Sequence, residues 1–141
     1  MSGMLITYLS KRKRHIIKTI SWRLIGTFDT FLLSYLLTSR IDQSLSIASI
    51  EIFTKIILYY FHERIWFKYG YISAMKRHIS KTFSWRIIAT SDTVIISFII
   101  TNNIYFGLSI GIIEVFTKMI LYFFHERLWY MSNFGLSEYR K

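Results

Sequence analysis

The sequence predicts an all-α integral membrane protein in which four transmembrane helices form two tandem helical hairpins. Long apolar stretches provide the first observation, because Leu24 to Ser39 and Ile87 to Ile113 each contain a single charged residue. The second is a repeat of the whole pattern after 63 residues, and the third is the concentration of Lys and Arg between the apolar stretches. A soluble amphipathic helix needs a wide polar face that these stretches do not provide. About 20 apolar residues cross a hydrocarbon core roughly 30 Å thick.

Four spans follow in order along the chain, over residues 19–38, 45–67, 82–101 and 107–130. The chain contains no Pro, so the helices are expected to be straight. Five segments result, and their boundaries are residues 1–13 (a basic N-terminal segment), 14–67 (the first two-helix unit), 68–76 (a linker), 77–130 (the second two-helix unit) and 131–141 (a tail).

The basic residues predict the orientation in the membrane. The N-terminus, the loop around residues 68–81 and the C-terminus carry nearly all the cations that flank the spans. Because Lys and Arg next to helix ends remain in the cytoplasm, both termini and the linker are predicted to be cytoplasmic. Anionic lipid is the expected partner of these clusters on that side of the bilayer, and nucleic acid is not expected.

The repeat is close and has no gap. Of the 53 positions aligned between Arg14–Trp66 and Arg77–Trp129, 31 are identical, and the identical positions are mostly polar rather than aliphatic. Two crossings per unit return the chain to its starting side, so the two units are parallel. The axis that relates them therefore runs along the membrane normal, unlike the axis of inverted repeats.

The motif K-T-x-S-W-R followed by D-T, and then E-x-F-T-K-x-x-L-Y-x-F-H-E-R-x-W, resembles a family of small bacterial membrane proteins known as a domain of unknown function. The resemblance covers both units, over residues 14–130. It implies a multi-pass protein of the bacterial cytoplasmic (inner) membrane. Some relatives resemble this domain fused to an adenylylsulfate kinase, which implies a connection with sulfur metabolism. The resemblance brings no activity and no catalytic residue.

Charged residues inside the spans are the candidate functional residues, because a charge in mid-bilayer costs about 2.5–3.5 kcal/mol and is usually paired or faces water. Depth along the helices predicts the ion pairs Asp29–Lys55 and Arg23–Glu63, and their repeats Asp92–Lys118 and Arg86–Glu126. Glu51 and Lys55 also have the i,i+4 spacing of an intrahelical pair. The complete predicted polar network consists of Arg23, Asp29, Glu51, Lys55, His62, Glu63, Arg86, Asp92, Glu114, Lys118, His125 and Glu126.

Several classes of function are excluded or disfavoured. The absence of Cys rules out disulfides and thiolate chemistry, and phosphate-binding and hydrolase motifs are missing. No cofactor, no metal and no enzymatic activity are therefore predicted. The enzymatic alternative is a metal site built from His62, Glu63, His125 and Glu126. Adjacent residues on a helix point about 100° apart, which disfavours it.

Two functions remain open. The first is a small oligomeric channel or transporter for an ion or a small polar solute, with charged residues inside the membrane. Four helices enclose little volume, so this function implies a homo-oligomer. The alternative is a non-catalytic scaffold or accessory subunit of a larger membrane complex, in which the charges fix the register of packed helices. The opposite charges of Arg23 and Lys55 and of Asp29 and Glu51, repeated in the second unit, leave the sign of a transported ion undecided.

Overall fold

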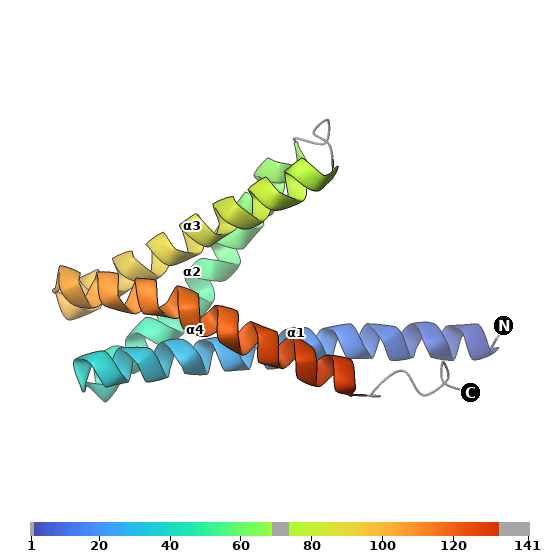
Figure 1. The fold of residues 1–141 in the computed structure, drawn as a ribbon, viewed down its shortest axis with the longest axis horizontal. Helices are drawn as coiled ribbons and strands as arrows, with labels where there is room; N and C mark the ends of the chain where they lie inside the picture. The colour runs from blue at the N-terminus through green and yellow to red at the C-terminus, as the bar shows by residue number, and fades with distance from the viewer. Residues whose placement is uncertain (1, 69–73, 133–141) are drawn as a thin grey trace. The chain divides into compact units, whose positions relative to one another are not determined.

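The computed structural model of the chain describes residues 2–68 and 74–132, and its side chains over residues 13–68 and 75–132. The described residues form four α-helices, as predicted (Figure 1). The helices are α1 (Ser2–Thr38), α2 (Ile41–Phe67), α3 (Ala74–Thr101) and α4 (Ile104–Met131). The chain divides into two compact units, of which unit 1 contains Met1–Gly26 and Thr117–Lys141 and unit 2 contains Thr27–Phe116.

Each helix begins before the span predicted for it, and the difference is greatest for α1, which begins at Ser2 rather than at residue 19. The apolar pattern marks only the part of a helix that is suited to lipid. Lys and Arg are good helix formers, so the basic segment at residues 11–14 continues the helix. Most of the predicted linker 68–76 and tail 131–141 lies outside the described residues.

Two short turns with the same geometry connect α1 to α2 and α3 to α4. Ser39 and Asn102, which are related by the repeat, adopt left-handed backbone conformations with φ of 54° and 52°. The hydroxyl of the preceding threonine donates to a carbonyl one turn back, with Thr38 Oγ1 2.7 Å from Ser34 O. A residue in the left-handed conformation ends a helix sharply, so each turn reverses the chain within two residues.

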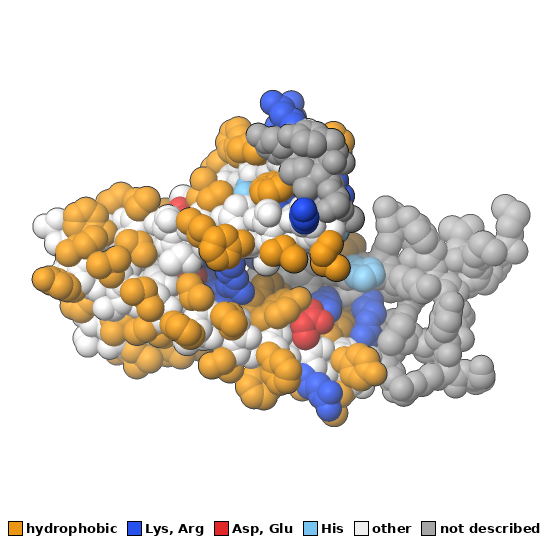
Figure 2. Space-filling view, turned by 45° about the horizontal axis from the view of Figure 1, so that its top comes forward, with side chains coloured by type: hydrophobic (Ala, Val, Ile, Leu, Met, Phe, Trp, Pro, Cys, Tyr) orange, Lys and Arg blue, Asp and Glu red, His pale blue; other side chains and the backbone are white. Residues whose placement is uncertain are grey.

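Three helices are long and apolar enough to cross a membrane: α2 (Ile41–Phe67), α3 over Met75–Thr101, and α4 (Ile104–Met131). Only 17% to 22% of the most apolar window of each is buried inside the protein. Hydrophobic side chains spread widely over the surface visible in Figure 2. Phe53 and Ile99, for example, are 68% and 69% exposed. This outer surface is suited to lipid rather than to water.

The buried side chains are mostly polar, which is the reverse of a soluble protein. Among the described residues, the buried polar and charged side chains are Asp29, Thr30, Ser34, Ser44, Glu51, His62, Thr93, Ser97, Glu114 and His125. The buried hydrophobic side chains are Ile47, Ala48, Ile96 and Ile110. Polar groups inside and apolar groups outside are the arrangement that a lipid environment requires.

Unit 2 contains a small apolar core beside the turns. Ile47, Ile96 and Ile110 are buried together, and Leu37 and Phe106 pack against them. This core holds the adjoining ends of all four helices in unit 2. The buried hydroxyls of Ser34, Ser44 and Ser97 lie at the same level, and the charged side chains lie further from the turns.

Candidate functional site

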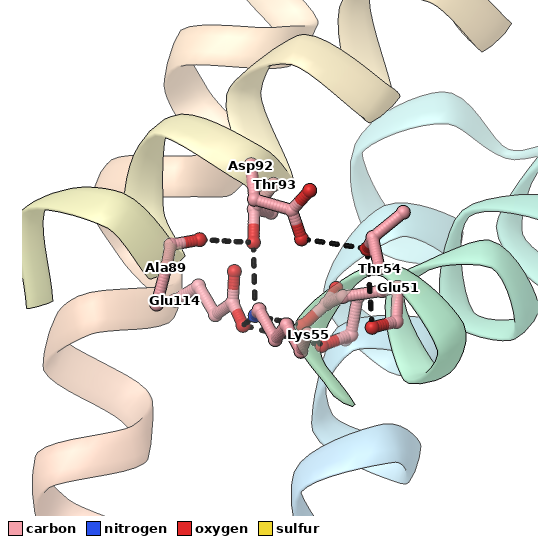
Figure 3. Close-up of polar contacts among 8 residues, drawn as sticks. Glu51, Thr54, Lys55, Ala89, Asp92, Thr93 and Glu114 are labelled. Atoms are coloured by element: carbon pink, nitrogen blue, oxygen red, sulfur yellow. Dashed lines mark hydrogen bonds and ion pairs between the residues drawn. The ribbon is translucent and has the colours of Figure 1, made fainter. Parts of the chain in front are cut away.

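Unit 2 contains a central cluster of five polar side chains from all four helices, namely Thr30, Glu51, Lys55, Thr93 and Glu114. Figure 3 labels the last four of them. Lys55 forms an ion pair with Glu51 on its own helix, and its Nζ lies 3.1 Å from Glu114 Oε1 and 3.1 Å from Thr93 Oγ1. The Lys55 side chain is 12% exposed, and the two glutamate side chains are 6% and 5% exposed. The ammonium group is therefore surrounded by oxygen atoms away from solvent.

The two glutamates of the cluster are related by the repeat and converge on the same groups. Thr30 Oγ1 lies 3.3 Å from Glu51 Oε1 and 3.4 Å from Glu114 Oε1. Both carboxylates also contact the Lys55 ammonium. Like charges this close repel each other unless a cation or a proton lies between them, so Lys55 stabilises the pair.

A second carboxylate contact lies beside the cluster, between α2 and α3. Asp92 Oδ2 accepts a hydrogen bond of 2.8 Å from Thr54 Oγ1. Thr93, the next residue on α3, donates to Ala89 O at 3.2 Å and also contacts Lys55 (Figure 3). Two adjacent residues of α3, Asp92 and Thr93, thus contact neighbouring side chains of the α2 turn that contains Glu51 and Lys55.

Nearer the far ends of α2 and α3 lies a histidine cluster formed by Tyr59, His62, Trp66, Ser84 and Trp85. Ser84 Oγ is 2.8 Å from His62 Nε2 and accepts a hydrogen bond of 3.1 Å from Trp66 Nε1. Trp85 stacks at an angle on His62, with 5.5 Å between ring centroids, and meets Tyr59 edge-on. His62 is only 4% exposed.

The same geometry occurs in unit 1, where Ser21, Trp22, Tyr122, His125 and Trp129 form a second histidine cluster. Ser21 Oγ is 2.8 Å from His125 Nε2, and Ser21 Oγ accepts a hydrogen bond of 3.3 Å from Trp129 Nε1. The Trp22 and His125 rings are 5.5 Å apart, as in the first cluster. Each cluster joins the first helix of one repeat to the second helix of the other repeat.

An ion pair stands next to each histidine cluster. Lys81 Nζ lies 2.6 Å from Glu63 Oε1, and Lys18 Nζ lies 2.7 Å from Glu126 Oε1. The predicted pairs Arg23–Glu63 and Arg86–Glu126 each join a residue of one unit to a residue of the other, and they stay predictions. Each observed ion pair joins helices of different repeats, α2 and α3 in unit 2 and α1 and α4 in unit 1.

The predicted partner of Lys55 is wrong. Lys55 pairs with Glu51 and Glu114, not with Asp29, although Asp29 is buried as expected. Asp92 accepts a hydrogen bond from Thr54 within unit 2, and its predicted ion pair with Lys118, a residue of unit 1, stays a prediction. Depth along the membrane gave the correct layer, but a glutamate reaches further toward an ammonium on another helix than an aspartate does. The i,i+4 pair of Glu51 and Lys55 is confirmed.

Exposure divides the predicted network into an inner and an outer set. Glu51, Glu114, His62 and His125 are buried, whereas Arg23 is exposed and Arg86 is half-buried. The arginines therefore do not belong to the buried set.

Some residues of these clusters were missed by the sequence analysis as candidate functional residues. The missed residues are Thr30, Thr93, Lys18, Lys81, Ser21, Ser84, Ser34, Ser97, Tyr59 and Tyr122. Each of these residues is identical at the equivalent positions of the two repeats. That identity was taken as a sign of function mainly for charged residues.

Among the buried side-chain atoms of the described residues that have no hydrogen-bond partner within the protein, four belong to serine and histidine side chains. They are Ser34 Oγ, Ser97 Oγ, His62 Nδ1 and His125 Nδ1. Ser34 and Ser97 are fully buried and lie one helical turn from Thr30 and Thr93, on the same helix faces. Buried polar groups are nearly always hydrogen-bonded, so these four atoms are suited to contact a ligand, water or a proton.

Outside these clusters, Arg40 and Asp42 form an exposed ion pair of 2.9 Å beside the α1–α2 turn. The hydrogen bond to Asp42 raises the pKa of the Arg40 guanidinium. Exposed pairs of this kind contribute little to stability, because water and salt screen the two charges. Within the part of the chain that the structure describes, no three His, Asp or Glu side chains gather in a group able to hold a metal ion.

Comparison with protein families identifies the repeat unit. The family model described as "Predicted membrane protein (DUF2061)" matches residues 16–67 and, a second time, residues 79–130. The chain belongs to this membrane protein family. Each match covers one two-helix unit, so the DUF2061 chain contains the family's unit twice. No curated protein and no solved structure matches the chain.

Proposed function

We propose that the protein moves an ion or a small polar solute across the membrane along the buried polar side chains of its helices. The central cluster carries this proposal. It places two carboxylates and an ammonium in the apolar middle of the helices, where each charge costs about 2.5–3.5 kcal/mol. Apolar side chains would pack these helices at no such cost. Charged groups in this position mark ion and solute pathways in membrane proteins.

The proposal includes α1 as a fourth span. α1 is related by the repeat to α3, which is long and apolar enough to cross a membrane. Its apolar part, from Leu24 to Thr38, contains only Asp29 as a charge, and Asp29 is buried. Four spans place both termini in the cytoplasm of a bacterium, with the basic N-terminal segment beside anionic lipid of the inner membrane. Association into a homo-oligomer would add the volume that a hydrated pathway needs.

The test is electrical conduction by the purified protein in a planar lipid bilayer. We expect a voltage-driven current that is absent from the empty bilayer. Replacing Lys55→Met together with Lys118→Met removes both lysines from the middle of the spans, and it should lower the current at least tenfold. Size-exclusion chromatography in detergent checks that the assembly is intact. Unchanged current in an intact variant, or no current in the native protein, contradicts the proposal.

A scaffold or accessory subunit is the second candidate, and one observation favours it. The ion pairs of the central cluster are closed within a single chain, as they would be if they only fixed the packing of the helices. Exchanging the two charges by Glu51→Lys with Lys55→Glu distinguishes the candidates. A scaffold should keep its assembly and a co-purifying partner after the exchange, whereas a pathway should change its conductance.

A further inference from the structure

We infer that the transported species is the proton, which is passed along hydrogen-bonding side chains of unit 2 without an open pore. This inference rests on the proposed function, because it names the substrate of the same buried groups. Chains of Asp, Glu and His inside a membrane are the usual components of proton relays. Unit 2 contains such a chain, formed by the central cluster, Asp92 with Thr54, and the histidine cluster of α2 and α3.

The sign of the buried charge favours a cation over an anion. The middle of the helices contains four carboxylates and two lysines, so negative charge is in excess. Arg23 and Arg86 balanced this count in the sequence, but in the structure Arg23 is exposed and Arg86 is half-buried, so neither belongs to the buried set. An anion would meet Glu51 and Glu114 together, whereas a cation or a proton reduces their mutual repulsion.

The geometry of the central cluster favours a proton over a metal cation. Lys55 already holds the position that a small cation would take, between two carboxylates and the Thr93 hydroxyl. An incoming metal ion would have to displace the ammonium and recruit several oxygens at once. A proton needs a single lone pair on Glu51 or Glu114. It also needs no open channel, so the small volume enclosed by four helices is no obstacle.

The chain of exchangeable groups continues on both sides of the cluster. Toward the turns, Ser34 and Ser97 each present a fully buried hydroxyl without a partner in the protein, one turn beyond Thr30 and Thr93. A hydroxyl that is free to donate and accept can pass a proton to the next group.

In the other direction, His62 Nδ1 is buried without a partner, while Nε2 contacts Ser84, which lies close to the Lys81–Glu63 pair. His62 is seven residues from Lys55 on α2, or about 10 Å along the axis. Bridging water must complete this part, as it commonly does between buried polar groups.

One transfer conserves protons and electrons. A proton arriving from the Ser97 side binds a carboxylate oxygen of Glu114, and Lys55 is then left with Glu51 as its charged partner. When that proton passes on toward Asp92 and His62, Glu114 is ionised again and Lys55 returns to both carboxylates. One proton enters and one leaves, only O–H and N–H bonds change, and the proton gradient itself drives the cycle. In this cycle the charge on Glu114 is balanced by Lys55, which also contacts Glu51, and the Thr30 hydroxyl contacts both carboxylates. Asp29 and Asp92 are the other carboxylates of this part of unit 2.

The test measures the reversal potential of the current in a planar bilayer with the full chain. A pH difference and a KCl difference are applied across the membrane in turn. If protons are conducted, the reversal potential follows the pH difference and does not move with the KCl difference. A reversal potential that follows KCl leaves the proposed function standing and overturns the proton assignment. Absence of any current overturns both.

The serine variant tests the path without disturbing the fold. Ser34→Ala with Ser97→Ala removes two hydroxyls that have no partner in the protein, so folding should not be weakened. We expect the proton current to fall at least fivefold. Ser46→Ala is the matched control, since Ser46 is exposed and only contacts Asp42 O. Glu51→Gln with Glu114→Gln should lower the current at least tenfold. A proton current unaffected by both double variants excludes this path.

Discussion

One serine hydroxyl in each repeat forms hydrogen bonds with two side chains of another helix. Ser84 Oγ contacts His62 and Trp66 at 2.8 Å and 3.1 Å and donates to the Lys81 carbonyl of its own helix at 3.1 Å. Ser21 makes the matching contacts in unit 1. A hydroxyl combines one donor with two acceptor lone pairs, so it satisfies all three groups, which no apolar residue of similar size could do.

Ser84→Ala should therefore destabilise the protein. The change leaves His62 Nε2 and the Trp66 indole without their common partner while both are largely buried. Each buried group left unsatisfied costs about 1–3 kcal/mol. The midpoint of thermal unfolding in detergent should fall clearly, and that of the exposed control Ser46→Ala should not change. Equal midpoints for the two variants would show that the serine is not a structural partner of His62.

At this scale the sequence predicted burial better than contacts. Glu51 and His62 were predicted to belong to a polar network inside the spans, and both are buried. The partner of Lys55 was not predictable in the same way. Several carboxylates share its layer of the membrane, and the choice between Asp29 and Glu114 depends on side-chain length and helix rotation, which hydropathy does not encode.

Between helices, small residues allow α3 and α4 to approach closely. Gly107 and Gly111 of α4 face α3 with the G-x-x-x-G spacing typical of packed transmembrane helices. A Cβ at Gly107 would lie 2.9 Å from Val94 O, a backbone atom that cannot move aside easily. The first repeat has Ser44 and Ala48 at the corresponding positions, so small residues are kept in both hairpins.

Gly107→Ala and Gly26→Ala should have opposite effects. Both changes gain about 1 kcal/mol of helix propensity. At Gly107 the new methyl group meets the α3 backbone, and overpacking of this kind costs about 1–3 kcal/mol. At Gly26 the nearest atom is Lys118 Cε at 3.8 Å, an ordinary contact, and the second repeat has Ala89 there. Unfolding in detergent should show a less stable G107A and a G26A that is as stable as the native protein or more so.

The sequence predicted the elements well and their ends less well. Four helices were expected and four are described, with turns that fall at the predicted polar breaks. The helix starts were predicted too late, because hydropathy detects the lipid-facing part alone. The short turns at Ser39 and Asn102 depend on a left-handed residue, and neither Ser nor Asn there is as strong a signal as Gly.

Considered as a whole, the molecule uses each repeat to complete the other. The histidine cluster of unit 2 joins α2 of the first repeat to α3 of the second, and that of unit 1 joins α1 to α4. Each repeat therefore supplies one half of each cluster. The family model matches one unit at a time, and in this chain two matches supply the complete clusters.

Cross-linking tests this exchange of helices between the repeats. The chain has no Cys, so a short bifunctional maleimide can react only with introduced pairs. Lys81→Cys with Glu63→Cys should cross-link efficiently, and so should Lys18→Cys with Glu126→Cys, because the native side chains are in contact at 2.6 Å and 2.7 Å. The control variant combines Lys81→Cys with Arg64→Cys. Residue 64 is one position further round α2 than residue 63, so this pair should react at least fivefold more slowly. Similar rates for both pairs contradict the exchange.

The direction of transport depends on the membrane topology of the protein. The topology in turn depends on whether α1 crosses the membrane. If it does, the number of spans is even, both termini are cytoplasmic, and Arg40 at the α1–α2 turn lies on the opposite side. Arg40→Cys should then react with a maleimide that cannot enter intact cells, because its side chain is 61% exposed. A cysteine at the C-terminal Lys141 should react only after the cells are opened.

With three spans the termini would lie on opposite sides and the parallel relation of the repeats would be lost. That outcome is difficult to reconcile with 31 identical positions, since residues kept identical in both units would then face environments of opposite polarity.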